Sequence, residues 1–289
     1  MTNTKQTYPE PVAGLMTLGD VRKEPEWCDY LSFGFTEQHV PDLCRMILDR
    51  DLFWADSESD EVWSAVHAWR TLAQLKADSA IPCLIELLGR VDEYDDDWTS
   101  EELPKVFGLI GPPALEPLRV FLADAGQGEW SRTGAGNALV NIGQRHPELR
   151  ADCITILSRQ LEQFVEQEES FNANLVSALL DLQGVEAAPV IEQAFAANKV
   201  DLMMQGDWED VQIELGLLNE RLTSAPDLRG LMAERMGFDP RELINRLKRE
   251  DTAKSQWEVE QKASKKAKTK AKAKRKQAKA SRKKQRNRK

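Results

Sequence analysis

Three residues at helical spacing are the first candidates for chemistry in this chain. Trp63, His67 and Arg70 follow one another at intervals of four and three residues, which places their side chains on one face of a helix. A histidine that titrates near neutral pH is a common general acid or base. Because no nucleophile or second base stands at a matching spacing, we favour a surface or hydrogen-bonding role for His67 over a catalytic one.

Tryptophans recur at the equivalent position of later helical segments. When these segments are aligned on their last apolar residues, Trp98 and Trp130 fall in the same column as Trp63. The fourth segment has Ser170 in that column, and the fifth has a tryptophan two places later. Acids stand beside each indole, most densely in the run D-E-Y-D-D-D-W that ends at Trp98. Indole faces attract cations and carboxylates accept hydrogen bonds from them, so this combination is typical of a surface that holds lysine or arginine.

The elements that position these residues are helices in a repeat. One apolar segment type occurs from His39, Ala80, Ala114, Cys153 and Ala187, and a second helical pattern follows each copy. No strand-like alternation competes with these patterns. A helical hairpin that cannot bury its apolar face alone must stack on its neighbours. The sequence therefore predicts an all-α fold of about five stacked helical hairpins.

The stretch W-R-T-L-A-Q-L-K-A-D-S-A-I-P-C-L-I-E-L-L, from Trp69 to Leu88, resembles a HEAT-like repeat of the phycobilisome-lyase type. The resemblance covers roughly residues 40–218 and implies an α-solenoid whose second helices line the concave wall. It implies no single activity, because such repeats serve scaffolds, enzymes and nucleic-acid binders alike. The chain departs from the di-iron HEAT-repeat hydroxylases, since it lacks their His-Glu pairs, and from the HEAT-like DNA glycosylases, since it is acidic. We expect no cofactor and no metal site.

On such a wall the tryptophans and acids form a groove for a basic peptide or protein segment. The candidate protein-binding residues are Trp63, His67, Arg70, Asp95, Asp96, Asp97, Trp98, Glu102, Glu129, Trp130, Asp207 and Trp208. The alternative is a series of solvated turns, because acids are favoured in the first turn of a helix and T-S-E-E from Thr99 matches a capping box. Both interpretations stay open at this point.

Charge divides the chain into two parts. Residues 262–289 hold 16 of the 39 Lys and Arg residues and no acid, which leaves 23 basic against 48 acidic residues and a charge near -25 for the rest. Without aromatic residues the tail has no stacking platform, so it would contact nucleic acid through phosphates. Its alternatives are RNA, ribosome or DNA binding, contact with its own solenoid, and a solvated appendage. The candidate nucleic-acid-binding residues are Lys265, Lys266, Lys268, Lys274, Arg275, Lys276, Arg282, Lys283, Lys284 and Arg286.

The predicted organisation has four parts: an N-terminal helical cap (1–38), the HEAT-like repeat solenoid (39–220), a linker with short helices (221–252), one of them starting at Asp239, and a disordered tail rich in Lys, Arg and Ala (253–289). Four scattered cysteines without a C-x-x-C pair are interpreted as reduced structural thiols: Cys28, Cys44, Cys83 and Cys153. Lacking a signal sequence or a long apolar run, the chain is predicted to be cytoplasmic, with no membrane partner.

Together these features predict a non-enzymatic scaffold or adaptor. Its acidic, Trp-bearing face would bind a protein partner, and its basic tail would bind an anionic one. The alternative comes from the repeat resemblance alone: a lyase or lyase chaperone that acts on a protein-bound chromophore, a bilin.

Overall fold

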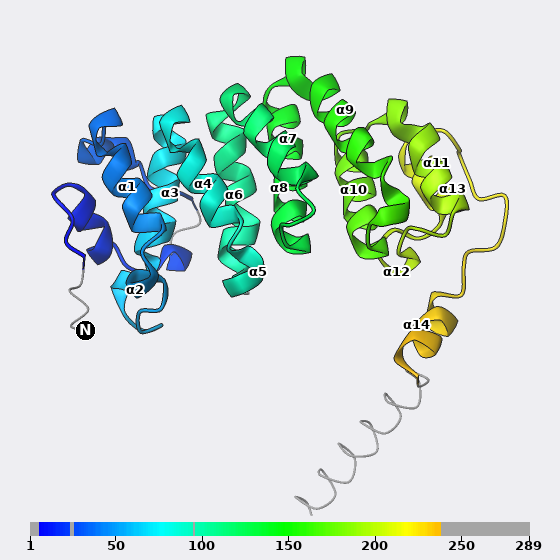
Figure 1. Ribbon diagram of the computed structural model, residues 1–289, viewed down its shortest axis with the longest axis horizontal. Coiled ribbons are helices and arrows are strands. Elements are labelled where there is room, and N and C mark those ends of the chain that lie inside the picture. Colours follow the sequence, from blue (N-terminus) through cyan, green and yellow to red (C-terminus); the bar gives the residue numbers. More distant parts are fainter. Residues whose placement is uncertain (1–5, 24–25, 95, 238–289) are drawn as a thin grey trace, which may run out of the picture. The chain divides into compact units, whose positions relative to one another are not determined.

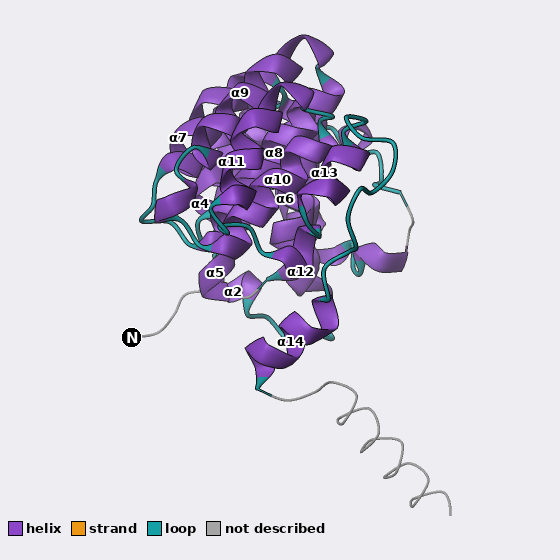
Figure 2. Ribbon diagram, turned by 90° about the vertical axis from the view of Figure 1, so that its right-hand side faces the viewer, coloured by secondary structure: helices purple, strands orange, loops and turns teal. Residues whose placement is uncertain are grey.

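The computed structural model describes residues 6–23, 26–94 and 96–237, and this part of the chain consists of helices and loops without a β-strand (Figure 2). The predicted all-α class is confirmed. Residues 1–226 form one compact unit, so the predicted cap and the repeats share one body. Residues 227–289 form a second unit, of which helix α14 (Leu228–Met236) is described.

Helices form where the apolar spacing predicts them. The first helices of the successive pairs are α1 (Val40–Ile47), α4 (Ile81–Leu88), α7 (Leu115–Ala123), α9 (Arg150–Leu161) and α11 (Ala188–Ala196). The second helices are α3 (Ser64–Leu75), α6 (Asp97–Ile110), α8 (Glu129–Arg145), α10 (Glu169–Asp181) and α13 (Trp208–Glu214). Short helices lie between the members of a pair: α2 (Arg50–Phe53), α5 (Val91–Tyr94) and α12 (Leu202–Gln205).

Short 3-10 turns lead into the α-helices. They span Glu37–His39 before α1, Asp60–Trp63 before α3, Asp78–Ala80 before α4, Pro112–Ala114 before α7, Pro147–Leu149 before α9, Phe164–Glu166 before α10 and Val185–Ala187 before α11. Several first helices or their leading turns carry proline at the first or second position. Proline is tolerated there because the missing N–H would have no partner within the helix, and it sets a sharp start for each pair.

The helix pairs stack in two layers (Figure 1). First helices contact first helices in the order α1, α4, α7, α9 and α11, while α3 contacts α6, α6 contacts α8 and α8 contacts α10. One continuous apolar core joins the layers, with Leu43, Leu84 and Leu157 from first helices and Phe107 and Leu139 from second helices, all fully buried. This stacking buries the apolar faces that an isolated hairpin would expose.

The segment predicted as an N-terminal helical cap contains three short 3-10 helices, Val12–Thr17, Val21–Lys23 and Tyr30–Phe33. Pro9, Pro11 and Gly19 interrupt the segment, because proline removes an N–H donor and Gly19 adopts a positive φ. The turns nevertheless bury Leu15 and Tyr30 and pack against α3, so they cover the first end of the array.

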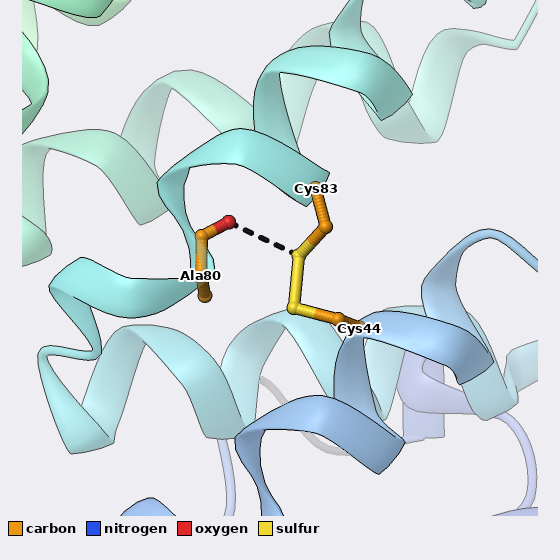
Figure 3. The surroundings of a disulfide bond; sticks show 3 residues. All are labelled: Cys44, Ala80 and Cys83. Atoms are coloured by element: carbon orange, nitrogen blue, oxygen red, sulfur yellow. Dashed lines mark hydrogen bonds between the residues drawn. A yellow bond between two sulfur atoms is a disulfide. The ribbon is translucent and has the colours of Figure 1, made fainter.

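The prediction of reduced thiols is wrong for two of the four cysteines. Cys44 on α1 and Cys83 on α4 form a disulfide, with Cα atoms 5.7 Å apart and a sequence separation of 39 (Figure 3). Neighbouring first helices lie side by side, so cysteines one repeat apart come within bonding distance. Cys28 and Cys153 are free, and burial raises the pKa of the Cys153 thiol to about 11, as expected of a structural thiol.

Some predictions concern residues outside the part of the chain that the structure describes. The helix predicted to start at Asp239 and the basic tail lie outside the described residues. No single helix in the described ranges is long and apolar enough to cross a membrane; Asp97–Ile110 and Pro112–Ala123, bent by 119°, meet the length and composition only as a pair.

Candidate functional site

The second helices α6, α8 and α10 form the walls of a groove with a volume of about 1050 Å³. Asp97 and Glu101 line it from α6, Trp130 and Asn137 from α8, and Asn174 from α10. Apart from the tryptophan, these lining side chains are polar, so the groove is suited to a ligand that forms hydrogen bonds and carries charge.

A contact across repeats fixes the start of α8. Asp92, from the short helix α5, accepts hydrogen bonds from the main-chain N of Trp130 (3.0 Å), the main-chain N of Ser131 (2.8 Å) and the Ser131 hydroxyl (2.5 Å). Gly128 makes room for it, because a Cβ there would lie 2.1 Å from the Asp92 carboxyl carbon. The carboxylate thus caps a helix N-terminus, where negative charge is stabilising. Trp130 is held in the first turn of α8 with 58% of its surface exposed.

The rest of the acidic run before Trp98 is divided between structure and surface. Glu93 pairs with Arg50, and Asp96 caps α6 by accepting from the main-chain N of Trp98 at 3.0 Å. The capping box predicted at Thr99 is wrong because α6 already begins at Asp97. Asp97 is exposed and lines the groove, and the candidate Asp95 lies outside the described residues. Asp96 therefore has a structural role, whereas the binding interpretation stays a prediction for Asp97.

The polar face predicted for the first repeat is not a surface. Arg70 and Glu102 form an ion pair in which each side chain is only 8% exposed, and Trp69 Nε1 donates to Glu102 at 2.9 Å. The Arg70 guanidinium also lies 5.1 Å from the centre of the Trp27 ring. Arg70 and Glu102 are therefore a buried pair that joins α3 to α6, and their prediction as binding residues is wrong. The polar residues of this helix face were predicted to be exposed, but oppositely charged side chains can be buried when they pair with each other.

His67 is likewise buried. Its Nε2 lies 2.8 Å from the main-chain oxygen of Gly19, and its Nδ1 lies 2.7 Å from the Tyr30 hydroxyl. A carbonyl oxygen can only accept, so Nε2 carries the proton and the hydroxyl donates to Nδ1. Burial lowers the pKa of His67, which keeps the ring neutral. The hydrogen-bonding role predicted for His67 matches these contacts, whereas its predicted place on a binding surface is wrong.

The predicted row of exposed indoles is reduced to one member. Trp63 and Trp98 are half-buried and meet edge to face, with ring centres 5.3 Å apart. Arg22 from the N-terminal segment lies 4.9 Å from the centre of the Trp63 ring. The contact of Arg22 and the contact between neighbouring repeats partly cover the first two tryptophans. Of the three aligned tryptophans, Trp130 is the exposed one, and it lines the groove.

The candidate binding residues near the last helix pair, α11 and α13, have structural partners. Asp207 caps α13 in a capping box with Asp210 and pairs with Arg221, whose hydrogen bond lowers the pKa of Asp207. Trp208 is half-buried, with its ring centre 6.1 Å from that of Phe195. Neither lines the groove of α6, α8 and α10. The site therefore does not extend along the whole array as predicted.

Polar side chains that were not predicted as a site complete the groove. Thr133 Oγ1 and Asn174 Nδ2 are buried, line the groove and have no hydrogen-bond partner in the described part of the protein. Glu129 Oε1, from a predicted candidate, is also a buried atom without a partner in the described residues, but Glu129 does not line the groove. The spacing of Asn137 and Asn141 places both on the Trp130 face of α8 from the sequence alone, although neither was among the predicted site residues.

One family model matches this chain. It is described as "Protein of unknown function (DUF1186)" and matches residues 41–225, which is more than half of the sequence. The chain belongs to the DUF1186 family. No curated protein and no solved structure matches it.

The region matched by the DUF1186 model includes the groove. It runs from α1 through α13 and therefore includes the three helices of the groove and both disulfide cysteines. Gly19 and Tyr30, which contact His67, precede the matched region. Among the described residues, no group of three or more His, Cys, Asp or Glu side chains is arranged to hold a metal ion.

Proposed function

We propose that this chain is a non-enzymatic scaffold or adaptor whose stacked pairs act as an α-solenoid of HEAT-like repeats. Its groove of α6, α8 and α10 binds a protein partner. The observation that carries this proposal is a groove of about 1050 Å³ that combines an exposed indole with buried polar atoms without partners. Exposed aromatic residues are typical anchors of protein interfaces.

The chemistry of the groove supports binding over catalysis. Its lining contains carboxylates, amides, hydroxyls and one lysine, and neither a histidine nor a cysteine. His67, the strongest catalytic candidate in the sequence, donates and accepts hydrogen bonds elsewhere in the protein. The alternative of a lyase acting on a protein-bound bilin rests on the repeat resemblance alone. A visible-absorbance change on mixing the protein with bilins would favour it.

We further propose that the basic tail serves an anionic partner, namely RNA, ribosome or DNA, and that the protein acts in the cytoplasm. The supporting observation is the segregation of 16 basic residues into the last 28 positions. Such a segment binds phosphates through charge and needs no folded surface.

Affinity capture with two matched variants tests the groove. Trp130→Ala removes the exposed indole of the groove, and Trp54→Ala removes another indole that is 65% exposed but does not line it. We expect a set of captured proteins that is lost with Trp130→Ala and kept with Trp54→Ala. Identical sets from the wild type and both variants would contradict the proposed function.

A further inference from the structure

Primary amides recur along the groove. Asn137 and Asn141 are four residues apart on α8, hence on one face, and Asn174 comes from α10. The side chain of Asn141 is oriented by a hydrogen bond of 2.9 Å from its Nδ2 to the main-chain oxygen of Asn137. Each amide carries both a donor and an acceptor, which is the combination that complements the N–H and C=O of an extended polypeptide.

Two polar atoms in the groove wall lack partners in the described structure, Thr133 Oγ1 and Asn174 Nδ2. Buried polar groups in folded proteins are normally hydrogen-bonded, and leaving one unpaired is costly. Both atoms lie just below the groove surface, on residues that line it. A rotation of either side chain toward the groove would let a main-chain N–H or carbonyl of a ligand satisfy it.

The charge of the groove selects the side chains of that ligand. Asp97 and Glu101 are exposed on α6, and Asp181 adds a third carboxylate from α10, against the single basic lining residue Lys105. Trp130, which is 58% exposed, lines the same groove. Carboxylates next to an indole bind lysine or arginine by charge-assisted hydrogen bonds and cation–π contact, and they repel phosphate.

The polarity of the lining also favours an extended segment over a helical one as the ligand. A helix satisfies its own main-chain groups and docks by laying apolar side chains into an apolar groove. Here amides and carboxylates dominate, and Val91, Pro104 and Val140 are the aliphatic exceptions. An extended segment uses the amides that a helix would leave unpaired.

We propose that the groove holds an extended peptide segment containing lysine or arginine. A cationic side chain lies against Trp130 next to the carboxylates of α6, and Asn137, Asn141 and Asn174 bind the peptide main chain. This inference rests on the protein-binding function proposed above and defines the chemistry of the partner.

Three labelled peptides test it against the full-length protein by fluorescence anisotropy. The first alternates lysine and serine over eight residues, the second is the same sequence with methylated main-chain nitrogens, and the third has aspartate for lysine. We expect the lysine peptide to bind, and methylation to weaken binding about tenfold because the N–H donors are lost. Equal binding of the methylated peptide would overturn recognition of the main chain.

Variants locate the binding. Trp130→Ala and Glu101→Gln are expected to weaken the lysine peptide about tenfold each, whereas Trp54→Ala has no effect. Asn174→Ala is expected to weaken the lysine peptide and its methylated form alike, because Nδ2 donates to a peptide carbonyl that methylation leaves in place. The aspartate peptide, which the basic tail attracts, is expected to respond to none of these substitutions. An equal response of the aspartate peptide to Trp130→Ala would overturn the charge selection.

The outcomes are distinguishable from those of the capture experiment. A partner captured through Trp130, together with no binding of the lysine peptide, overturns this inference and leaves the proposed function intact. Binding of the lysine peptide without any partner that depends on Trp130 contradicts the proposed function.

Discussion

At the scale of single residues, the first repeat shows how polar side chains come to be buried. Arg70, Glu102 and Trp69 satisfy one another, so the cost of removing two charges from water is offset by their mutual contacts. His67 is buried in another way, as a neutral ring between a hydrogen-bond donor and a hydrogen-bond acceptor. Each arrangement depends on partners distant in sequence.

Removing one member of the buried ion pair is expected to be far more costly than removing an exposed neighbour. Glu102→Ala leaves the Arg70 guanidinium uncompensated, and we expect the free energy of unfolding to fall by about 3–5 kcal/mol. Glu101→Ala, one residue away and exposed, should change it by less than about 0.5 kcal/mol. Urea denaturation of both variants measures the difference, and equal losses would contradict a buried pair.

The stability of the protein is expected to depend on the protonation of His67. Its pKa is lowered by burial from the ordinary value of 6.5, so below pH 6.5 the unfolded chain binds a proton that the folded chain does not. The free energy of unfolding must then fall as pH falls below 6.5 toward the folded-state pKa, and it is unaffected by this residue above that range.

Urea denaturation at pH 7.5 and pH 5.5 tests this. We expect the wild type to lose more stability between the two values than His67→Gln, which has no titrating ring. The same loss in both proteins would show that other groups cause the pH dependence.

At the scale of elements, polar contacts and a disulfide between successive repeats add to the packing of the apolar core. Asp92 on α5 caps α8 of the next pair, and Arg70 on α3 binds Glu102 on α6. The disulfide between Cys44 and Cys83 joins α1 to α4 in the other layer. Each contact fixes one helix relative to its counterpart one repeat later, and so holds the register of the stack.

The disulfide is expected to contribute substantially to stability. The bond closes a loop with a sequence separation of 39 residues, and for a loop of this size the chain-entropy estimate is about 4 kcal/mol. Cys44→Ser should therefore lower the free energy of unfolding under oxidising conditions and have little effect under reducing ones.

Thiol titration of the unfolded, unreduced protein provides a direct check. Two reactive thiols, from Cys28 and Cys153, are expected if the bond is present. Four thiols would contradict it. Because disulfides are rare in the cytosol, the same titration on protein taken from cells bears on the cytoplasmic location, which stays a prediction.

At the scale of the whole molecule, charge is the dominant feature of the sequence. A body near -25 carries a tail with 16 basic residues and no acids. These opposite charges support the proposal of a cationic partner for the groove and an anionic one for the tail. Association with both is expected to weaken with added salt.

The tail prediction has a simple test. A chain ending at Glu250 is expected to lose RNA binding, since it lacks every basic residue of positions 262–289. The full-length chain should bind with an affinity that falls steeply between 50 and 200 mM salt, because bound lysines release counterions from the phosphates. Filter binding or anisotropy measures both effects, and unchanged RNA binding by the shorter chain would refute the prediction.

Local periodicity determined the helices from the sequence alone. Apolar residues at intervals of three and four specify amphipathic helices, and their repetition specifies stacked pairs, because each pair must cover the apolar face of the next. The ranges found for α4 and α8, for example, contain the patterns that predict them. Helical hydrogen bonds join residues four apart, so this information lies within a short window of sequence.

Only the tertiary structure decided which polar residues face solvent. Trp63 and Trp130 share a repeat position, yet Arg22 and Trp98 cover the first while the second stays open. Periodicity places a side chain on a face of its helix and says nothing about what packs against that face. Burial of His67 depends on the main chain of Gly19, 48 residues away, and the disulfide on a partner one repeat away. Such contacts arise only when distant segments fold together.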